Sequence, residues 1–413
     1  MERLELARLL GAPPLVGEPG MSPVVIDETD PGQFMTRFAI AAGGNGPVFL
    51  ADPSWSAGAR KQFSKSVQAR PKEGNAGFPK SARGWLCIPS GGTSGEIKLA
   101  RHDEDTIAAA VRGFCAHFGV RQVNALGVLP LHHVSGLMAW MRCALTSGEY
   151  RPCDWKKLEA GKYPALSTGD WFLSLVPTQL QRLLPLPEAV AWLRRFRVIF
   201  IGGGPAWPEL MEAAAKVKLP VSLSYGMTES AAMVAALRPA EFLAGARSVG
   251  APLPHARVTI EAGGVVRVTG ESIFRGYWPE WRETDGFTTE DLGSFDAQGH
   301  LQILGRRDAV IITGGKKVYP AEVETALRTT GEFGEIAVIG MPDAQWGERV
   351  VACYPAAEKK PDLAKVENRM AAALSPHQHP KCYVAVAEWP RNAQGKLNRT
   401  RLTQLAQAAS VKD

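Results

Sequence analysis

The densest group of chemically capable residues in this chain is a run of small and hydroxylated residues that ends on a lysine. Glycines let a backbone approach an anion closely, and consecutive N–H groups and hydroxyls can surround phosphate oxygens. The spacing differs from that of a Walker A loop, which occurs nowhere in the sequence. By itself the run fits either a phosphate-binding loop or a plain surface turn. Its polar and glycine residues are Ser90, Gly91, Gly92, Thr93, Ser94, Gly95 and Lys98.

Three other charged residues lie in short polar runs. Glu229 closes Tyr-Gly-Met-Thr-Glu, Asp291 follows Thr-Thr-Glu, and Lys396 lies within Gln-Gly-Lys-Leu-Asn-Arg. Taken singly, each has an ordinary structural interpretation: a helix-start carboxylate, a turn residue and a loop lysine. Their interpretation therefore depends on how they are ordered along the chain.

Histidines offer two further candidates. His133 follows a strand-like segment and Pro130, which favours the wall of an active site over a satisfied core histidine. His377 and His379 with Cys382 match no metal-ligand spacing, so a tight loop is the better interpretation there.

Composition places limits on the class of protein. The chain has 413 residues, 45% of them hydrophobic, and a formal net charge of +6 spread over short basic pairs. So small an excess fits anionic small molecules and gives no reason to expect a nucleic-acid partner. The six cysteines contain no Cys-x-x-Cys, and no apolar run approaches a membrane span of about 18 residues. We expect reduced cysteines, no membrane span and a cytoplasmic location.

The elements that must position these residues alternate regularly in the first two thirds of the chain. Strand-like segments at 125–129, 171–176, 198–201 and 221–224 are each followed by a turn, and most of these turns lead into a helical pattern. Such alternation predicts a mainly parallel sheet covered on both faces. Ligands bind at the carboxyl ends of the strands in such sheets, where these turns fall.

From about Arg247 the pattern changes. A hairpin is predicted around residues 262–264, and after Asp308 strands and helices form a compact α+β unit. The sequence therefore predicts an α/β large domain, with mainly parallel covered sheets and a β-hairpin or barrel-like part, over residues 1–307. A small α+β domain is predicted over residues 308–413.

Several motifs that lie far apart along the chain together resemble the motifs of one known family. Their order resembles that of the adenylate-forming superfamily, which includes acyl-CoA synthetases, peptide-synthetase adenylation domains and luciferases. The run 90–98 resembles the phosphate loop of that superfamily, and it departs from the usual pattern at Gly91, Ile97 and Leu99. Glu290 is a further departure, in the motif that usually reads Thr-Gly-Asp-Leu-Gly. The remaining matching segments are 224–229, 289–293, 305–308, 313–315, 319–324 and 392–399.

The resemblance implies roles in activating a carboxylic acid with ATP and then transferring it to coenzyme A. The phosphate loop would hold the β- and γ-phosphates, and Glu229 with Thr228 would sit near Mg²⁺. Asp291, assisted by Arg306, would bind the ribose, and Lys396 would be catalytic at the α-phosphate. The residues implied around adenine and AMP are Gly202, Gly203, Gly204, Pro205, Ser224, Tyr225, Gly226, Met227 and Thr228.

The resemblance also implies a moving domain. Asp308 would be the hinge about which the small domain rotates between the two half-reactions. Thr313, Gly314 and Gly315 would then line the tunnel for the coenzyme A arm. The cofactor and co-substrates so implied are Mg²⁺, ATP and coenzyme A.

The acid itself is indicated by two segments. Residues 129–137 and 174–180 are most similar to o-succinylbenzoate–CoA ligases of menaquinone and phylloquinone synthesis. The alternatives are a ligase for another aromatic or medium-chain acid, a standalone adenylation enzyme that loads a carrier protein, and a non-catalytic nucleotide-binding relative. The last is disfavoured because the charged motif residues are all present. The candidate acid-binding residues are His133, Ser135, Arg142 and Gln179, and His133 is also a candidate catalytic residue beside Lys396.

The large domain is shorter than is usual in the superfamily. The shortening is expected before Ser90, in the amino-terminal part. A homodimer is left open by this, because a dimer contact usually placed there is in doubt.

Overall fold

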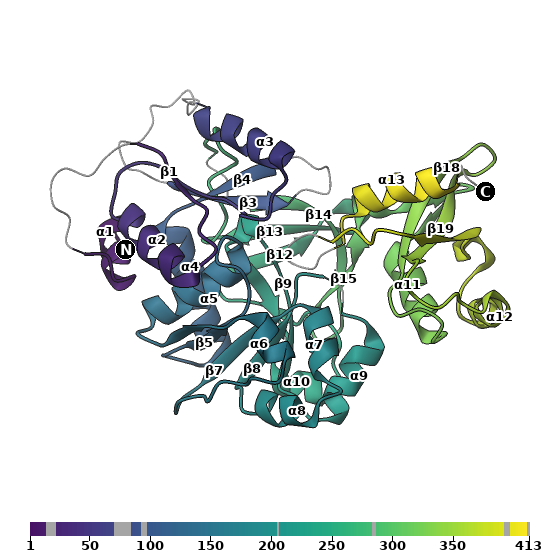
Figure 1. Cartoon of the computed structure of the whole chain (residues 1–413), viewed down its shortest axis with the longest axis horizontal. Helices are drawn as coiled ribbons and strands as arrows, with labels where there is room; N and C mark the ends of the chain where they lie inside the picture. The colour runs from purple at the N-terminus through teal and green to yellow at the C-terminus, as the bar shows by residue number, and fades with distance from the viewer. Residues whose placement is uncertain are drawn as a thin grey trace.

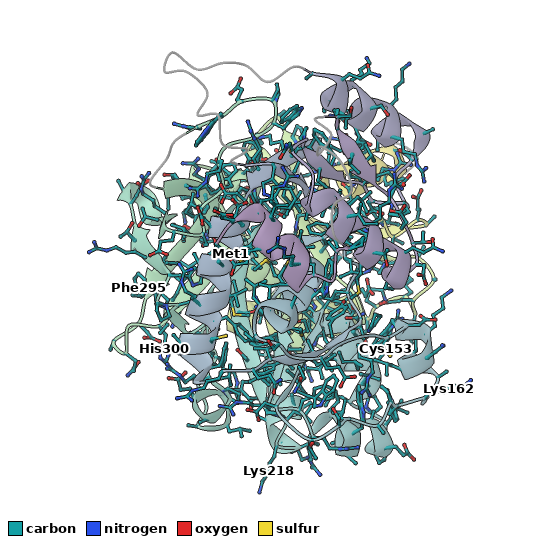
Figure 2. All side chains as sticks on the ribbon, turned by 90° about the vertical axis from the view of Figure 1, so that its left-hand side faces the viewer. Met1, Cys153, Lys162, Lys218, Phe295 and His300 are labelled. Atoms are coloured by element: carbon teal, nitrogen blue, oxygen red, sulfur yellow. The ribbon has the colours of Figure 1, made fainter. Side chains whose placement is uncertain are left out.

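A computed structural model of the chain describes residues 1–13, 22–69, 84–91, 97–204, 206–282, 286–391 and 397–410. Three sheets with their helices form the larger part of the molecule, and a fourth sheet with α11, α12 and α13 forms a smaller unit beside β15 (Figure 1). Within the described ranges, none of the helices combines the length and the apolar character that crossing a bilayer requires. Lys162 and Lys218 project into solvent at the surface (Figure 2), as expected for scattered basic residues.

The central sheet has seven strands in the order β11-β10-β9-β8-β7-β5-β6. Strands β5 to β9 pair in parallel, whereas β10 and β11 are antiparallel, so the predicted mainly parallel sheet is confirmed. The strands are β5 (Asn124–Gly127), β6 (Tyr150–Pro152), β7 (Trp171–Leu175), β8 (Val198–Ile201), β9 (Val221–Met227), β10 (Ala232–Ala236) and β11 (Ala251–Pro252).

Helices cover both faces of this sheet because successive strand residues point to opposite sides. Along β8, Ile199 and Ile201 pack in the core with α7 to α10, while Val198 and Phe200 pack in the core with α4 and α5. Four helices, α7 to α10, begin with a proline at their first position, where its missing N–H costs nothing. The helices are α4 (Glu104–Phe118), α5 (Val134–Leu145), α6 (Trp155–Glu159), α7 (Pro177–Leu183), α8 (Pro187–Leu193), α9 (Pro208–Lys216) and α10 (Pro239–Leu243).

An amino-terminal sheet, in the order β1-β2-β3-β4, carries the ends of the phosphate loop. Ser90 and Gly91 are the last residues of β3, and they pair with Lys98 and Ile97 of β4. The sequence placed Ser90, Gly91 and Lys98 in a flexible loop, and this was wrong because cross-strand pairing extends both strands into the motif. Residues 92–96 lie outside the described residues. The elements are α1 (Arg3–Leu9), β1 (Val24–Ile26), α2 (Pro31–Ala42), β2 (Val48–Leu50), α3 (Ala57–Gln68), β3 (Leu86–Gly91) and β4 (Ile97–His102).

A third, antiparallel sheet in the order β12-β13-β14-β15 follows in the chain. The hairpin expected around residues 262–264 is present, with the short 3₁₀ turn η2 (Ala262–Gly264) joining its strands. Asp291 lies within β14, directly opposite Arg306 of β15. The strands are β12 (Ala256–Ile260), β13 (Val265–Gly270), β14 (Gly286–Phe295) and β15 (Leu301–Arg306).

The smaller unit begins after the 3₁₀ turn η3 (Arg307–Ala309). Its sheet runs β17-β16-β19-β18, with β20 paired in parallel to β19. Sequence reasoning missed β17 and α13. Buried Glu324 accepts hydrogen bonds from the Val338 backbone N–H at 2.8 Å and from Arg399 at 2.5 Å, which joins α11, β18 and α13. The elements are β16 (Ile311–Thr313), β17 (Lys316–Val318), α11 (Pro320–Thr329), β18 (Ala337–Asp343), β19 (Gly347–Pro355), α12 (Leu363–Ala373), η4 (Pro376–Gln378), β20 (Cys382–Val386) and α13 (Arg399–Ser410).

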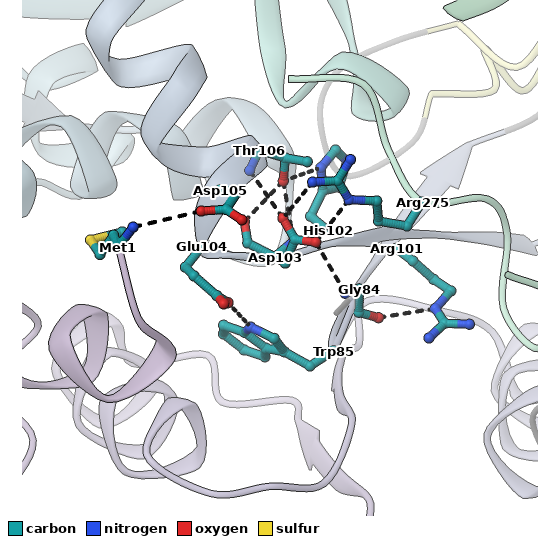
Figure 3. Close-up of polar contacts among 10 residues, drawn as sticks. All are labelled: Met1, Gly84, Trp85, Arg101, His102, Asp103, Glu104, Asp105, Thr106 and Arg275. Atoms are coloured by element: carbon teal, nitrogen blue, oxygen red, sulfur yellow. Dashed lines mark hydrogen bonds and ion pairs between the residues drawn. The ribbon is translucent and has the colours of Figure 1, made fainter. Parts of the chain in front are cut away.

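A buried carboxylate, Asp103, joins the amino-terminal sheet to the segment after β13 (Figure 3). Its side chain is fully buried and caps α4 by accepting from the Thr106 backbone N–H at 3.0 Å. It also accepts from Arg275 Nε at 2.8 Å and from the Gly84 backbone N–H at 3.3 Å. Burial alone would raise the pKa of Asp103. With its other partners, the Arg275 guanidinium lowers this pKa by a larger amount, so the pKa of Asp103 lies below that of an ordinary aspartate. The folded protein therefore holds an ionised, paired carboxylate in its interior.

We expect Asp103→Asn to lower the free energy of unfolding of the larger part by about 3–5 kcal/mol, because it leaves Arg275 without its buried counter-charge. The pKa of Asp103 is lower in the folded than in the unfolded chain. The stabilisation that ionised Asp103 provides is therefore fully present above the ordinary Asp pKa of about 3.9. It is lost as the pH falls through the pKa of Asp103 in the folded protein. Urea titrations should show wild-type stability falling more steeply than that of the variant below about pH 4.

Asp105 provides a control on the same helix. Its side chain is 48% exposed and lies 3.6 Å from the amino-terminal nitrogen. Asp105→Asn should change the free energy of unfolding by no more than about 0.5 kcal/mol. Equal losses of unfolding free energy in the two variants would show that the buried Asp103–Arg275 pair stabilises the fold no more than a surface carboxylate does.

Candidate active site

Glu229 is the centre of a group of polar side chains drawn from three distant segments. It lies in the 3₁₀ turn η1 (Thr228–Ser230) that follows β9, and only 6% of its surface is exposed. Its Oε1 atom accepts a hydrogen bond from Ser90 Oγ at 2.5 Å and one from the Tyr277 hydroxyl at 2.6 Å. The Lys98 Nζ atom lies 5.5 Å from the centre of the Tyr277 ring. The structure therefore brings Ser90, Lys98 and Glu229 together, and adds Tyr277 to them.

His102, at the end of β4, fixes the backbone beside Glu229. Its Nε2 atom lies 2.7 Å from the Thr228 carbonyl oxygen, and its Nδ1 atom lies 3.1 Å from Thr106 Oγ1. A carbonyl only accepts hydrogen bonds, so Nε2 must carry the proton. Burial lowers the pKa of His102 to about 4, and the ring is therefore neutral at pH 7. This neutral ring links the Asp103 contacts to the turn that carries Glu229.

Asp291 forms a second polar group with residues from β9 and β15. The Tyr225 hydroxyl donates a hydrogen bond to Asp291 Oδ2 at 2.6 Å, and Arg306 Nη1 lies 3.8 Å from Oδ1. Burial raises the pKa of Asp291. The Tyr225 hydroxyl and the Arg306 guanidinium lower this pKa by a smaller amount, so the net shift is upward. Burial and the neighbouring Asp291 carboxylate also raise the pKa of Tyr225, so the phenol remains a donor. The two predicted ribose-binding residues thus lie together, beside one predicted adenine residue.

Arg306 also contacts Asp308. Its Nε and Nη2 atoms donate to the two Asp308 carboxylate oxygens at 2.8 and 2.7 Å, a bidentate pair. This pairing, more than the Asp291 contact, raises the pKa of Arg306. The residue expected to be the hinge is therefore connected through one guanidinium to the residue expected to bind ribose.

The glycine turn after β8 lies next to the end of β9. Gly202 is half-buried and Gly203 and Gly204 are exposed, while Pro205 lies outside the described residues. A Cβ atom on Gly202 would meet Ser224 Oγ at 3.2 Å, and one on Gly226 would overlap the Ala232 carbonyl at 1.9 Å. Only glycine fits the backbone at position 226. Tyr225 and Met227, like Ser224, are half-buried at this edge.

Of the acid-site candidates, His133 lies at the amino-terminal end of α5, beside the carboxylate of Asp52. The Nε2 atoms of His132 and His133 are each 3.4 Å from an Asp52 oxygen. Burial raises the pKa of Asp52, but the two imidazoles and Ser54 lower it well below its usual range, so the carboxylate is ionised. His133 is thus part of an Asp–His–His group that the sequence analysis did not predict.

The other acid-site candidates have separate surroundings. Arg142 is only 5% exposed, and its guanidinium carbon lies 4.3 Å from the centre of the Phe114 ring. Burial lowers the pKa of Arg142 to about 10, so it remains charged at neutral pH. Gln179 Oε1 accepts from the Val176 backbone N–H at 3.0 Å and so caps α7, whereas Ser135 is exposed on α5.

The expected coenzyme A segment forms the turn between β16 and β17. Thr313 is buried, and Gly314 and Gly315 have φ values of +54° and +75° that favour glycine. A Cβ atom on Gly314 would lie 2.9 Å from the Trp346 ring, whereas one on Gly315 would meet nothing within 4 Å. Lys396 and the middle of the phosphate loop, Gly92 to Gly95, lie outside the described residues.

Sequence reasoning missed three residues of these groups. Tyr277 lies outside the motifs quoted for the resemblance, and it reaches Glu229 only because the backbone around residue 276 pairs with β4. His102 and Asp52 each stand alone in the sequence, with no spacing pattern. A single sequence offers no signal for such contacts, because they join segments that are far apart in the chain.

Comparison with known proteins gives matches over both parts of the chain. The family described as AMP-binding enzyme matches residues 80–278, and the family described as its C-terminal domain matches residues 322–396. The chain is 31% identical over 327 residues to a 2-succinylbenzoate–CoA ligase of Enterococcus faecalis, covering 75% of this chain and 67% of that protein. It is 34% identical over 299 residues to the enzyme of that name from Geobacillus kaustophilus, covering 68% of this chain and 60% of that protein.

Among solved structures, the chain resembles the o-succinylbenzoate CoA synthetase of Bacillus subtilis in complex with its acyl-adenylate intermediate. The TM-score is 0.79 at 22% identity, over 97% of this chain and 91% of the other. The chain thus shares that fold, although its alignments span only 60–67% of the length of the two curated relatives above. The expected family and fold are confirmed: this chain belongs to the family of AMP-binding, adenylate-forming enzymes.

Proposed function

We propose that this chain is an AMP-forming acid–thiol ligase that converts o-succinylbenzoate to its coenzyme A thioester, as part of menaquinone or phylloquinone synthesis. The observation that carries the proposal is the position of two carboxylates near the end of β9. Glu229 lies in the turn that follows β9, and Asp291 lies on β14. Glu229 is held by Ser90 and Tyr277, and Asp291 is held by Tyr225. One carboxylate suits a metal-bound phosphate, and the other suits a diol.

The first half-reaction would form an acyl-adenylate. A carboxylate oxygen of the acid attacks the α-phosphorus of ATP, an O–P bond forms, and the bond to pyrophosphate breaks. Ser90 and Lys98 would contact the leaving phosphates, and Lys396 would stabilise the charge that grows at the α-phosphate. Asp291 would accept from the ribose hydroxyls while Arg306 orients it. Positioning and charge neutralisation account for the catalysis in such a step.

The residues around Glu229 fit a magnesium ion. A buried carboxylate would repel a triphosphate, whereas a hard divalent cation between them is attracted to both. Both hydroxyl donors, from Ser90 and Tyr277, bind the same oxygen and are neutral, so they orient the carboxylate without cancelling its charge. Glu229, with Thr228 next to it, would hold the ion, which when bound supplies charge neutralisation for the phosphates.

The second half-reaction would transfer the acyl group. The thiol sulfur of coenzyme A attacks the acyl carbon, the C–O bond to AMP breaks, and the thiol proton passes to solvent. We propose that residues 308–413 form a mobile domain that removes Lys396 from the site and brings Thr313, Gly314 and Gly315 in. The six cysteines, which are free in the structure, suit the reducing cytoplasm proposed as its location.

The choice of acid rests on residues 129–137 and 174–180 and on the names of the relatives. The second carboxylate of o-succinylbenzoate requires a hydrogen-bonding or cationic partner. Ser135 and Gln179 are the candidates on the two segments, and His133 lies beside Ser135 in the chain. Arg142, which packs against Phe114, would contribute a buried positive charge. A ligase for another aromatic or medium-chain acid is the second candidate function.

A panel of carboxylic acids tests the substrate. We expect o-succinylbenzoate to exceed benzoate and octanoate in kcat/KM by at least about 10²-fold, because pocket groups left unpaired reject analogues that lack the second carboxylate. Pyrophosphate release with ATP, followed by thioester formation with coenzyme A, is the measurement. Equal rates would refute this acid but not the ligase activity, and pyrophosphate release without thioester formation would favour a carrier-protein adenylation enzyme.

Glu229→Gln tests the proposed metal contact. We expect pyrophosphate release to slow by roughly 10²–10³-fold, because the variant keeps the side-chain shape but loses the charge that holds the cation at the phosphates. Higher Mg²⁺ should recover part of the rate. Glu271→Gln is the control, since Glu271 is 70% exposed and pairs with Arg112 at the surface. An unchanged rate in Glu229→Gln would exclude Glu229 from metal binding.

Two variants test the moving domain. Asp308→Pro fixes φ near −65° at the proposed hinge, and we expect it to retain adenylation and lose thioester formation. Gly315→Leu should have the same effect by obstructing the thiol's path, since a Cβ atom there meets no protein atom within 4 Å. Gly315→Ala controls for the strain that any side chain meets at a φ of +75°, and it should retain more thioester formation than Gly315→Leu. Single-turnover assays that start from acyl-adenylate separate the two steps. Full thioester formation by both variants would place the hinge and the tunnel elsewhere.

A further inference from the structure

Asp52, His132 and His133 form a compact cluster that the nucleotide-binding groups do not use. Asp52 follows β2 by two residues, and the histidines immediately precede α5. The three residues are between 6% and 9% exposed. Their three ligand atoms, one from each residue, lie within 4.8 Å of one another. Two imidazoles and a carboxylate from two separate segments thus meet in the interior.

The distances within this cluster are unusual for hydrogen bonds. Each Nε2 atom is 3.4 Å from an Asp52 oxygen. Protein N–H···O bonds run from about 2.7 to 3.2 Å, so both contacts are long. Ligand atoms on a tetrahedral zinc, at about 2.0–2.1 Å from the metal, are separated by about 3.3 Å along each edge of the tetrahedron. The two 3.4 Å contacts are similar in length but involve different Asp52 oxygens, and the three ligand atoms lie within 4.8 Å of one another, so an ion at the centre would draw them slightly closer.

Two further observations support a ligand role. The His132 Nε2 atom is buried and, among the described residues, has no hydrogen-bond partner in good geometry, although it lies 3.4 Å from Asp52 Oδ1. The Asp52 Oδ1 atom accepts from the Ser54 backbone N–H at 2.8 Å and from Ser54 Oγ at 2.6 Å, which fixes the orientation of the carboxylate. Outer contacts of this kind are what hold a metal-binding carboxylate in place.

We propose that Asp52, His132 and His133 bind a divalent transition metal, with zinc as the ion that fits best. Imidazole ligands suit zinc, whereas magnesium prefers oxygen, so this site is distinct from the one expected at Glu229. Asp52 also lines a cavity of about 380 Å³ with Trp55, from which water can supply a fourth ligand. The ion would tie the segment after β2 to the start of α5. The inference does not depend on the proposed function, and it assigns His133 to the metal rather than to the acid.

Zinc binding to tag-free, chelator-stripped full-length protein tests the site. We expect one equivalent of zinc, measured by metal analysis after dialysis and by calorimetric titration, and a higher Tm when zinc is added. Cobalt in place of zinc should give the intense visible absorption of a tetrahedral site. Asp52→Asn and His132→Asn should each weaken zinc binding by at least about 10²-fold and abolish the Tm shift.

His300→Asn is the matched control. His300 also lies near two carboxylates, 3.6 Å from Glu241 and 4.0 Å from Asp296, but among the described residues it belongs to no compact three-ligand group (Figure 2 labels its position). This variant should bind zinc as the wild type does. A metal-free thermal transition shows that each variant is folded. Failure of the wild type to bind zinc would leave only an ion-pair cluster, and undiminished binding by Asp52→Asn and His132→Asn would place the metal elsewhere.

Discussion

The arrangement of the polar groups around Glu229 depends on one buried ion pair, Asp103 with Arg275. A carboxylate without a partner at this depth would be costly, so the segment that carries Arg275 is held against β4. The backbones of the two segments are also hydrogen-bonded. The Arg275 backbone N–H donates to the Arg101 carbonyl at 2.8 Å, and the Arg101 backbone N–H donates to the Gly276 carbonyl at 3.0 Å. These contacts position Tyr277 so that its hydroxyl donates to Glu229. Since Asp103 also caps α4, the same carboxylate fixes the helix that packs on the central sheet.

Buried acidic residues in this chain differ in the kind of partner they have. Asp103 and Glu324 each accept from an arginine, which neutralises their charge inside the protein. Glu229 accepts from two hydroxyls instead. Hydroxyl donors orient a carboxylate but leave its negative charge in place, so Glu229 retains an attraction for a cation. The partner, rather than the residue type or its burial, separates structural carboxylates from those suited to bind ligands.

The boundary between the two parts of the molecule is connected to Asp291 of the third sheet through Arg306. Arg306 lies opposite Asp291 in the third sheet and holds Asp308 through two hydrogen bonds. Rotation about Asp308 would disturb the guanidinium that also faces Asp291. Asp308 takes the Nε and Nη2 donors of Arg306, while Asp291 faces Nη1, so one guanidinium connects the third sheet to the start of the smaller unit.

Local sequence determined the elements whose signals are short in range. The buried run at β8, the proline that begins α7 and the hairpin around residues 262–264 follow from periodicity and turn chemistry, and the ordered motifs indicated the family. Tertiary structure alone decided which distant groups meet. It placed Tyr277 on Glu229, extended β3 to Ser90 through cross-strand pairing, and brought Asp52 to His132. Propensity and periodicity act over a few neighbouring residues, whereas these contacts exist only once packing and strand register have brought together segments that are far apart in the chain.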